Sequence, residues 1–263
     1  MKIGLIIIGD EILSGKRQDK HLGKFIELLS ERGLALSWVR YAGDHRPRIT
    51  ADLKDAFASG DLVFSCGGIG ATPDDHTRQC AAAALGVELA LHAQARELIL
   101  ERMRDVAAEQ GLPYEPARAD NLHRLNMGVF PVGARIIPNP YNKIAGFSFG
   151  DVHFVPGFPV MAWPMMAWVL DQQYTHLHGA DRSIERSVIV FGAMEASLTP
   201  LMEDIEARFA GVRVFSLPSV DHPQWGRHIE LGVKSTEDPV LAYAALREGL
   251  QHFGATLGPE AVR

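Results

Sequence analysis

Residues 62–77 read Leu62-Val63-Phe64-Ser65-Cys66-Gly67-Gly68-Ile69-Gly70-Ala71-Thr72-Pro73-Asp74-Asp75-His76-Thr77. The apolar start predicts a short strand, and the alanine-rich residues after Thr77 predict a helix. Because glycine lacks a Cβ, the three glycines between them let backbone N–H groups approach a ligand closely. The start of the helix adds unpaired donors and the positive end of a dipole. The pattern therefore predicts a phosphate cradle, with candidate residues Gly67, Gly68, Gly70, Ala71 and Thr72.

Acidic residues follow two earlier apolar strands. Residues 3–8 form a β-branched run typical of a strand buried on both faces of a parallel sheet, and Asp10 and Glu11 come directly after it. A second predicted strand, at 36–41, ends just before Asp44. Because ligands of open α/β sheets bind at the carboxyl ends of the strands, we expect these acids to lie beside the glycine loop.

The chemistry of these acids suits a divalent cation. Magnesium takes oxygen ligands, usually one or two carboxylates together with substrate phosphates. Asp10, Glu11 and Asp74 are therefore candidate metal ligands, because a carboxylate has the wrong charge to hold a bare phosphate. Ser14 is a candidate hydroxyl donor to the phosphate.

Each candidate also has a purely structural interpretation, which the sequence leaves open. The glycines could form a tight turn without a ligand, and the paired aspartates could complement the helix dipole. Asp10 and Glu11 could likewise only cap the first helix. Lys143 could neutralise phosphate charge or be solvated.

The remaining pattern predicts an alternating α/β domain over residues 1–177. Its strand-helix alternation indicates a mostly parallel sheet, and the prolines near 134–140 indicate an edge strand. The further predicted elements are helices at 47–59, 77–85, 93–110 and 161–178, and strands at 61–65 and 151–155. The tryptophans and methionines of 163–168 are typical of a core or a subunit interface, so we also expect a homo-oligomer.

The pattern changes between residues 177 and 182. Strands at 187–191, 212–217 and 228–234 and helices at 195–210 and 239–253 predict a second, smaller α+β domain over residues 182–254. The tail after Gly254 is expected to be frayed.

Composition limits the class of partner. The chain has 263 residues, a formal net charge of −6 and a pI near 6.0, which give no basic footprint for nucleic acid or an anionic membrane. The apolar run at 3–8 is too short to cross a bilayer. Two cysteines cannot make a disulfide framework, so a reducing cytoplasm is the expected compartment.

Three motifs together resemble one family. They are Gly-Asp-Glu-Ile-Leu-Ser-Gly at 9–15, Ala-Gly-Asp at 42–44 and the glycine loop at 66–77. The sequence resembles the molybdopterin-binding (molybdenum-cofactor biosynthesis) domain family, in the CinA-like version (competence/damage-inducible protein A). The match covers about residues 1–170, and residues 182–254 resemble the small KH-like domain of that version. We expect the family's third domain, a pyridine-nucleotide amidohydrolase, to be absent here.

The resemblance implies a three-layer α/β/α fold that binds the phosphate of a molybdopterin or a nucleotide at the glycine loop. In adenylyl-transferring relatives, acids at the positions of Asp44 and Asp75 support metal-assisted chemistry on a phosphoanhydride, which implies catalytic roles for both. CinA-like relatives are credited with metal-dependent hydrolysis of ADP-ribose.

This sequence departs from the family pattern at three places. Ala71 replaces a proline, and Asn142-Lys143-Ile144-Ala145-Gly146 replaces the usual Gly-Thr-Ala-Pro-Gly. Val160-Met161-Ala162 stands where the family carries a glutamate, so that carboxylate is missing. We therefore expect a protein that binds a phosphorylated pterin or nucleotide, with ADP-ribose pyrophosphatase-like activity as one outcome. A binding module without turnover and an oligomeric regulatory protein are the alternatives.

Overall fold

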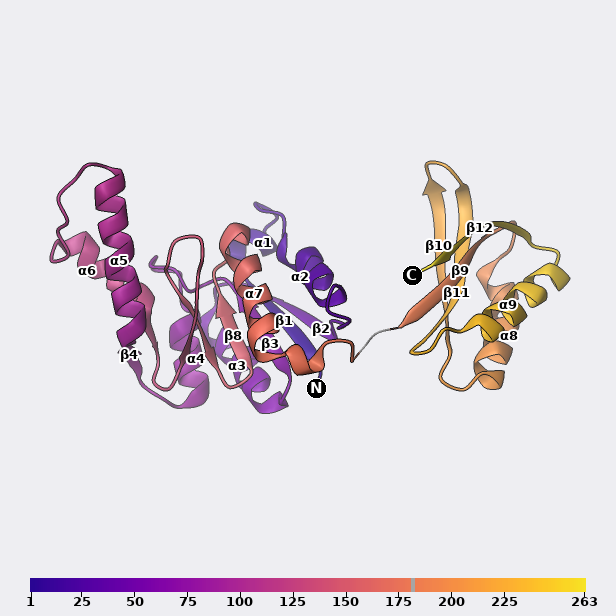
Figure 1. Ribbon diagram of the computed structural model, residues 1–263, viewed down its shortest axis with the longest axis horizontal. Helices are drawn as coiled ribbons and strands as arrows, with labels where there is room; N and C mark the ends of the chain where they lie inside the picture. Colours follow the sequence, from indigo (N-terminus) through magenta and orange to yellow (C-terminus); the bar gives the residue numbers. More distant parts are fainter. Residues whose placement is uncertain (181–182) are drawn as a thin grey trace. The chain divides into compact units, whose positions relative to one another are not determined.

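A six-stranded sheet organises residues Met1–His178, one of the two units into which the chain divides (Figure 1). The computed structural model describes residues 1–180 and 183–263, so the expected start of the second domain at 182 lies outside the described residues. Within those ranges, none of the helices combines the length and the apolar character that a membrane span requires.

The sheet of unit 1 runs in the order β2-β1-β3-β8-β7-β6. Its first four strands are parallel, and β7 is antiparallel to β8 and β6. Their bounds are β1 Ile3–Ile8, β2 Trp38–Ala42, β3 Leu62–Cys66, β8 Val152–Val155, β7 Gly146–Phe149 and β6 Arg135–Ile137. Ile7 lies level with Cys66, and Cys66 lies level with Val155. The carboxyl ends of β1, β3 and β8 therefore meet at one edge.

Helices cover both faces of this sheet, which confirms the expected three-layer, mostly parallel fold. Alternate side chains of β1 point to opposite faces, as strand geometry requires. Ile3, Leu5 and Ile7 pack against α2 (His21–Ser30) and α7 (Pro159–Gln173). Ile6 and Ile8 pack on the other side, against α3 (Arg46–Ser59) and α4 (Thr77–Leu85).

The tryptophan and methionine stripe of α7 lies in the core of unit 1. Met165 and Met166 are fully buried, and Trp163 and Trp168 pack partly buried against the same cluster. The core interpretation of this stripe is therefore confirmed, and self-association through α7 stays a prediction.

The other elements of unit 1 include three that the sequence did not indicate. Asp10–Leu13 form a one-turn helix, α1, where a turn was expected. Leu89–Leu91 (β4) pair with Val129–Pro131 (β5) in a small antiparallel sheet. Between them lie α5 (Ala93–Glu109), α6 (Ala119–Arg124) and the 3-10 turn η1 (Leu125–Gly128), and a second 3-10 turn, η2 (Thr175–Leu177), follows α7.

Unit 2, Gly179–Arg263, is an antiparallel sheet in the order β10-β11-β9-β12 with two helices. Its elements are β9 Ile184–Phe191, α8 Glu195–Arg208, β10 Arg213–His222, β11 Gly226–Ser235, α9 Val240–His252 and β12 Thr256–Val262. The expectation of a frayed tail is wrong, because β12 pairs with β9 and completes the sheet.

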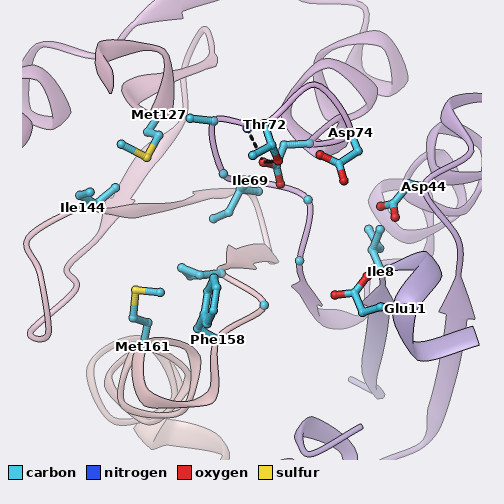
Figure 2. Close-up of a pocket in the computed structure, with 18 of the residues that line it drawn as sticks. Ile8, Glu11, Asp44, Ile69, Thr72, Asp74, Met127, Ile144, Phe158 and Met161 are labelled. Atoms are coloured by element: carbon cyan, nitrogen blue, oxygen red, sulfur yellow. Dashed lines mark hydrogen bonds between the residues drawn. The ribbon is translucent and has the colours of Figure 1, made fainter. Parts of the chain in front are cut away.

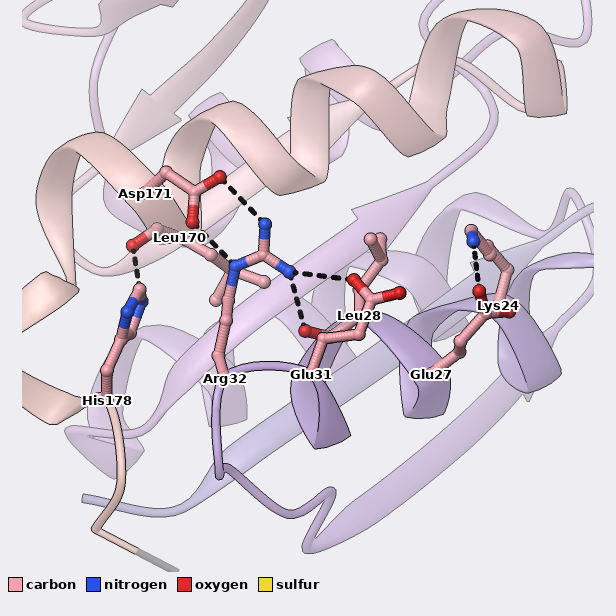
Figure 3. Close-up of polar contacts among 8 residues, drawn as sticks. All are labelled: Lys24, Glu27, Leu28, Glu31, Arg32, Leu170, Asp171 and His178. Atoms are coloured by element: carbon pink, nitrogen blue, oxygen red, sulfur yellow. Dashed lines mark hydrogen bonds and ion pairs between the residues drawn. The ribbon is translucent and has the colours of Figure 1, made fainter.

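An arginine joins the two helices that cover one face of unit 1 (Figure 3). The Arg32 guanidinium donates to both carboxylate oxygens of Asp171 on α7, at 2.6 and 2.7 Å, and to the Leu28 carbonyl oxygen at 2.7 Å. The hydrogen bond from Arg32, with the nearby guanidinium charge, lowers the pKa of Asp171. The pair therefore ties α7 to the end of α2.

We expect Arg32→Met to lower the free energy of unfolding by about 1–2 kcal/mol, because charge-assisted bidentate hydrogen bonds exceed the value of an ordinary surface pair. Denaturant titration measures the change. Lys24→Met is the control, since the Lys24–Glu27 pair joins neighbouring turns of α2 and should contribute less than about 0.5 kcal/mol. Equal losses in the two variants would contradict the proposed tie.

A buried polar chain lies at the start of β8. The His153 ring is within 2.7 Å of the Ser148 hydroxyl and 2.9 Å of the Tyr174 hydroxyl, which donates to Asp151. Burial, with a smaller contribution from the Arg135 charge, lowers the pKa of His153 to about 3. The folded protein therefore keeps this ring neutral.

His153 should make stability depend on pH. Between about pH 6.5 and pH 3 the unfolded chain binds a proton here that the folded chain does not, so stability falls as pH falls, by about 1.4 kcal/mol per pH unit. We expect His153→Gln to reduce the slope of unfolding free energy against pH between pH 6 and 5 by about this amount. Exposed His252→Gln is the control, and an unchanged slope in His153→Gln would refute the assignment.

Candidate functional site

A cavity of about 540 Å³ opens at the edge where β1, β3 and β8 end (Figure 2). The loops after β1, β2, β3 and β8 line it, together with the loop between β6 and β7. Most of the residues expected from the sequence are brought together here: Glu11, Asp44, Gly67, Gly68, Gly70, Ala71, Thr72, Asp74 and Asp75. Asp10 and Ser14 instead line an adjoining open depression, which shares Glu11, Asp44 and Asp74 with the cavity.

The glycine loop requires glycine at two positions. Gly67 has φ +101°, and a Cβ there would lie 2.3 Å from the Ile8 carbonyl oxygen. Gly68 has φ +68°, and a Cβ there would lie 2.1 Å from the Thr77 hydroxyl. Both the left-handed backbone and the close approach to β1 and α4 therefore exclude a side chain.

The carbonyl groups of this loop are held by α4. The Thr77 hydroxyl donates to the Gly67 oxygen at 3.0 Å, and the Thr77 amide donates to the Gly68 oxygen at 2.9 Å. The next two carbonyl oxygens, of Ile69 and Gly70, accept from the guanidinium of Arg78 at 2.7 and 2.5 Å. Arg78 is 4% exposed, so four consecutive carbonyl groups are fixed by buried donors.

The backbone N–H groups of the same loop are free. Within the described residues, the amides of Gly68, Ile69, Gly70 and Ala71 donate no hydrogen bond to the protein. Four neighbouring amides with fixed carbonyls, at the wall of a cavity, form the kind of concavity that binds anions. The arrangement can hold a phosphate.

The opposite part of the cavity is acidic. The Asp10 amide donates to the Asp44 carboxylate at 2.9 Å, and the Asp44 amide donates to the Asp10 carboxylate at 3.1 Å. These bonds hold the loops after β1 and β2 together. Desolvation raises the pKa of Asp44, an amide hydrogen bond from Asp10 opposes this, and the charges of Asp10, Glu11 and Asp74 raise it further.

This acidic group offers oxygen ligands to a hard cation. In the part of the chain that the structure describes, no three His, Cys, Asp or Glu side chains form a group placed to hold a metal ion by themselves. Magnesium usually takes only one or two carboxylates and completes its shell with water and substrate phosphates. A cation would also relieve the repulsion that the charges of Asp10, Glu11 and Asp74 exert on Asp44, so one or two of these four carboxylates fit such a role.

Asp75 is engaged in the turn itself. One of its carboxylate oxygens accepts from the Thr72 amide at 2.8 Å and from the Thr72 hydroxyl at 2.6 Å. A Cβ at Gly70 would lie 2.5 Å from that oxygen. Asp75 thus shapes residues 70–75, and its catalytic role stays a proposal.

Several lining residues were not predicted from the sequence, among them Arg17, Met127, Asn142, Ile144, Phe158 and Met161. Arg17 is the one cationic side chain among the lining residues of the described chain, and the basic pair that follows Gly15 was the available signal. The others come from η1, the β6–β7 loop and the start of α7, which no local pattern connects with the glycine loop.

Lys143 does not take part in the cavity. Its ammonium group lies 2.6 Å from Glu101 and 2.7 Å from Asp105, both on α5. Hydrogen bonds to these carboxylates raise the pKa of Lys143. These ion pairs lie at the exposed surface, so of the two sequence interpretations the solvated side chain describes Lys143 better than the phosphate ligand does.

Comparison with known proteins agrees with this geometry. The model of the "Probable molybdopterin binding domain" family matches residues 4–176. A CinA-like protein of Anaeromyxobacter sp. (strain K) is 32% identical over 61% of this chain and 38% of its own length. One from Geobacter metallireducens is 27% identical over 100% of this chain and 61% of its own length. The chain thus spans less than two thirds of each of these two relatives.

A crystal structure of CinA from Thermoplasma acidophilum, a protein described as of unknown function, shares the fold of unit 1. The two superimpose with a TM-score of 0.53 at 24% identity, covering 65% of this chain and 98% of that one. The family match spans the sheet, the glycine loop and the acidic loops described above. The chain therefore belongs to the family of probable molybdopterin-binding domains and is similar to CinA-like proteins.

Proposed function

We propose that the cavity binds a phosphorylated nucleotide or pterin, with the phosphate on the free amides of residues 68–71. The observation that carries this proposal is the division of the loop into bonded carbonyls and unbonded amides. The exposed guanidinium of Arg17 lies in the same cavity wall and adds positive charge.

We further propose that the protein hydrolyses a nucleotide phosphoanhydride, such as that of ADP-ribose, with a divalent cation. The cation would neutralise charge on the phosphate oxygens, and one or two carboxylates among Asp10, Glu11 and Asp74 would hold it. Water attacks phosphorus, the anhydride P–O bond breaks, and AMP and ribose 5-phosphate leave. Asp44, which lines the cavity beside Glu11 and Asp74, would orient the water and accept its proton.

Release of AMP from ADP-ribose with Mg²⁺ or Mn²⁺ tests the hydrolase. We expect Asp44→Asn to lower the rate by about 100-fold, a typical contribution of a general base, while ADP-ribose affinity changes less than about tenfold. Exposed Asp221→Asn in unit 2 is the matched control and should retain full activity. Absence of metal-dependent AMP release by the unaltered protein would reject hydrolysis.

Binding without turnover is the second candidate function. It is favoured by Asp75, because one oxygen of its carboxylate already accepts two hydrogen bonds from Thr72. Calorimetry would then show ADP-ribose binding that depends on the glycine loop, with no product formed on prolonged incubation with either cation.

A further inference from the structure

The loop between β6 and β7 is built by its own hydrogen bonds. The Asn139 side chain is 4% exposed and donates to the Asn142 side-chain oxygen at 2.8 Å and to the Ile144 carbonyl at 2.9 Å. The Asn142 oxygen also accepts from the Ile144 amide at 3.0 Å. This segment departs from the family pattern, and its own hydrogen bonds nevertheless hold it in a defined conformation.

Lys143 fastens this loop to α5. Its backbone is left-handed, with φ +64°, a conformation that costs a non-glycine residue about 1–2 kcal/mol. The ion pairs with Glu101 and Asp105 hold the side chain on α5, while its neighbours Asn142 and Ile144 line the cavity. These two ion pairs therefore hold the loop so that Ile144 forms part of the cavity wall.

Ile144 contributes to an apolar end of the cavity. Figure 2 shows Ile144, Met127, Met161, Phe158 and Ile69 on one side, and Glu11, Asp44 and Asp74 on the other. The glycine loop runs between the two ends. Aliphatic and thioether side chains give a flat aromatic ring dispersion and sulfur contacts but no hydrogen bonds.

Asn142 is the polar side chain at this end, and its oxygen and one of its two N–H groups are already engaged. Its oxygen accepts two hydrogen bonds, and its nitrogen donates to the Met161 sulfur at 3.3 Å. The side chains of this wall therefore offer little that distinguishes the polar edge of one ring from that of another.

From this wall we infer that the site binds the aromatic ring of its ligand through apolar contacts, without hydrogen bonds from side chains to the polar atoms at the ring's edge. The inference rests on the proposed function and names its ligand class: a phosphorylated purine-sized heterocycle, selected by its phosphate and its flat ring and not by its ring substituents. A hydrophobic pocket discriminates weakly against an added polar group, whereas a hydrogen-bonding pocket rejects the wrong analogue strongly.

Three ligands with the same phosphate test this inference by calorimetry: AMP, IMP and ribose 5-phosphate, which has no ring. We expect AMP and IMP to bind within about tenfold of each other, and ribose 5-phosphate to bind at least about 30-fold more weakly than AMP. A difference of more than tenfold between AMP and IMP would overturn the inference, and so would equal binding of AMP and ribose 5-phosphate.

A variant locates the ring at this wall. We expect Ile144→Ala to weaken AMP by about five- to tenfold, from the lost buried methyl groups, and to leave ribose 5-phosphate unchanged. Exposed Ile26→Ala on α2 is the control. An equal loss for both ligands would show that Ile144 supports the loop and not the ring. If none of the three ligands binds, the proposed phosphate site is wrong and the inference is wrong with it. If AMP and ribose 5-phosphate bind equally, the phosphate site stands and only the inference about the ring is wrong.

Discussion

Gly68→Ala is expected to weaken binding of ADP-ribose by at least about 100-fold, because the loop cannot keep its amides in place around a Cβ. The added atom would lie 2.1 Å from the hydroxyl of Thr77, which is fully buried and already donates to the Gly67 oxygen. Displacing the loop loses charge-assisted hydrogen bonds of about 1.5–3 kcal/mol each, and two such bonds account for the expected change.

The left-handed backbone of Gly68 adds a smaller conformational cost to the alanine variant, and a control variant separates this cost from the steric clash. Gly60 ends α3 with φ +69°, and a Cβ added there would meet nothing within 4 Å, so Gly60→Ala carries the conformational cost without the clash. Calorimetry with ADP-ribose and denaturant titration would be run on both variants. Wild-type affinity in folded Gly68→Ala would disprove the amide cradle.

Much of unit 1 could be predicted from the sequence, because its parallel strands are buried on both faces. The continuous apolar run at Ile3–Ile8 and the strand at Leu62–Cys66 carry that signal in their own residues. The start and end of α4 at Thr77 and Leu85 were predicted correctly for the same local reason, since an alanine-rich run stops at Gly86.

The elements that could not be predicted depend on partners far along the chain. β4 and β5 have three residues each, and their pairing joins Ala90 to Phe130. β12 contains Gly258 and Pro259, which argue against a strand, and it forms because β9 offers a free edge. Tertiary pairing outweighs local propensity in both cases.

The candidate site likewise has one part that local sequence predicts and one part that depends on distant contacts. The glycine loop and the acids could be found because each follows its own strand. The apolar wall could not, since Met127, Ile144 and Met161 meet only after the β6–β7 loop is fastened to α5 by Lys143. The role of Arg78 was hidden as well, because an arginine in the first turn of a helix is usually a solvated side chain.

Arg78→Met should remove two of the hydrogen bonds that join the glycine loop to α4. The guanidinium donates to two consecutive carbonyls, so its removal leaves the oxygens of Ile69 and Gly70 without these buried donors. Each unsatisfied group costs about 1–3 kcal/mol, so we expect a loss of about 2–5 kcal/mol in unfolding free energy. Because the peptide planes of these residues orient the amides of Gly70 and Ala71, we also expect ADP-ribose to bind about 10- to 100-fold more weakly.

A stability loss alone would not identify Arg78 as a positioning residue, so the control is another largely buried arginine. Arg32→Met removes three hydrogen bonds, one of them to a carbonyl, against two for Arg78→Met, but Arg32 lies between α2 and α7 and lines no part of the cavity. It should lose stability and keep its affinity for ADP-ribose. Arg78→Lys should fall between the wild type and Arg78→Met, since an ammonium group cannot reproduce the planar fork that reaches both carbonyls. Equal affinity of Arg78→Met and Arg32→Met for ADP-ribose would show that Arg78 stabilises α4 but does not position the amides of the glycine loop.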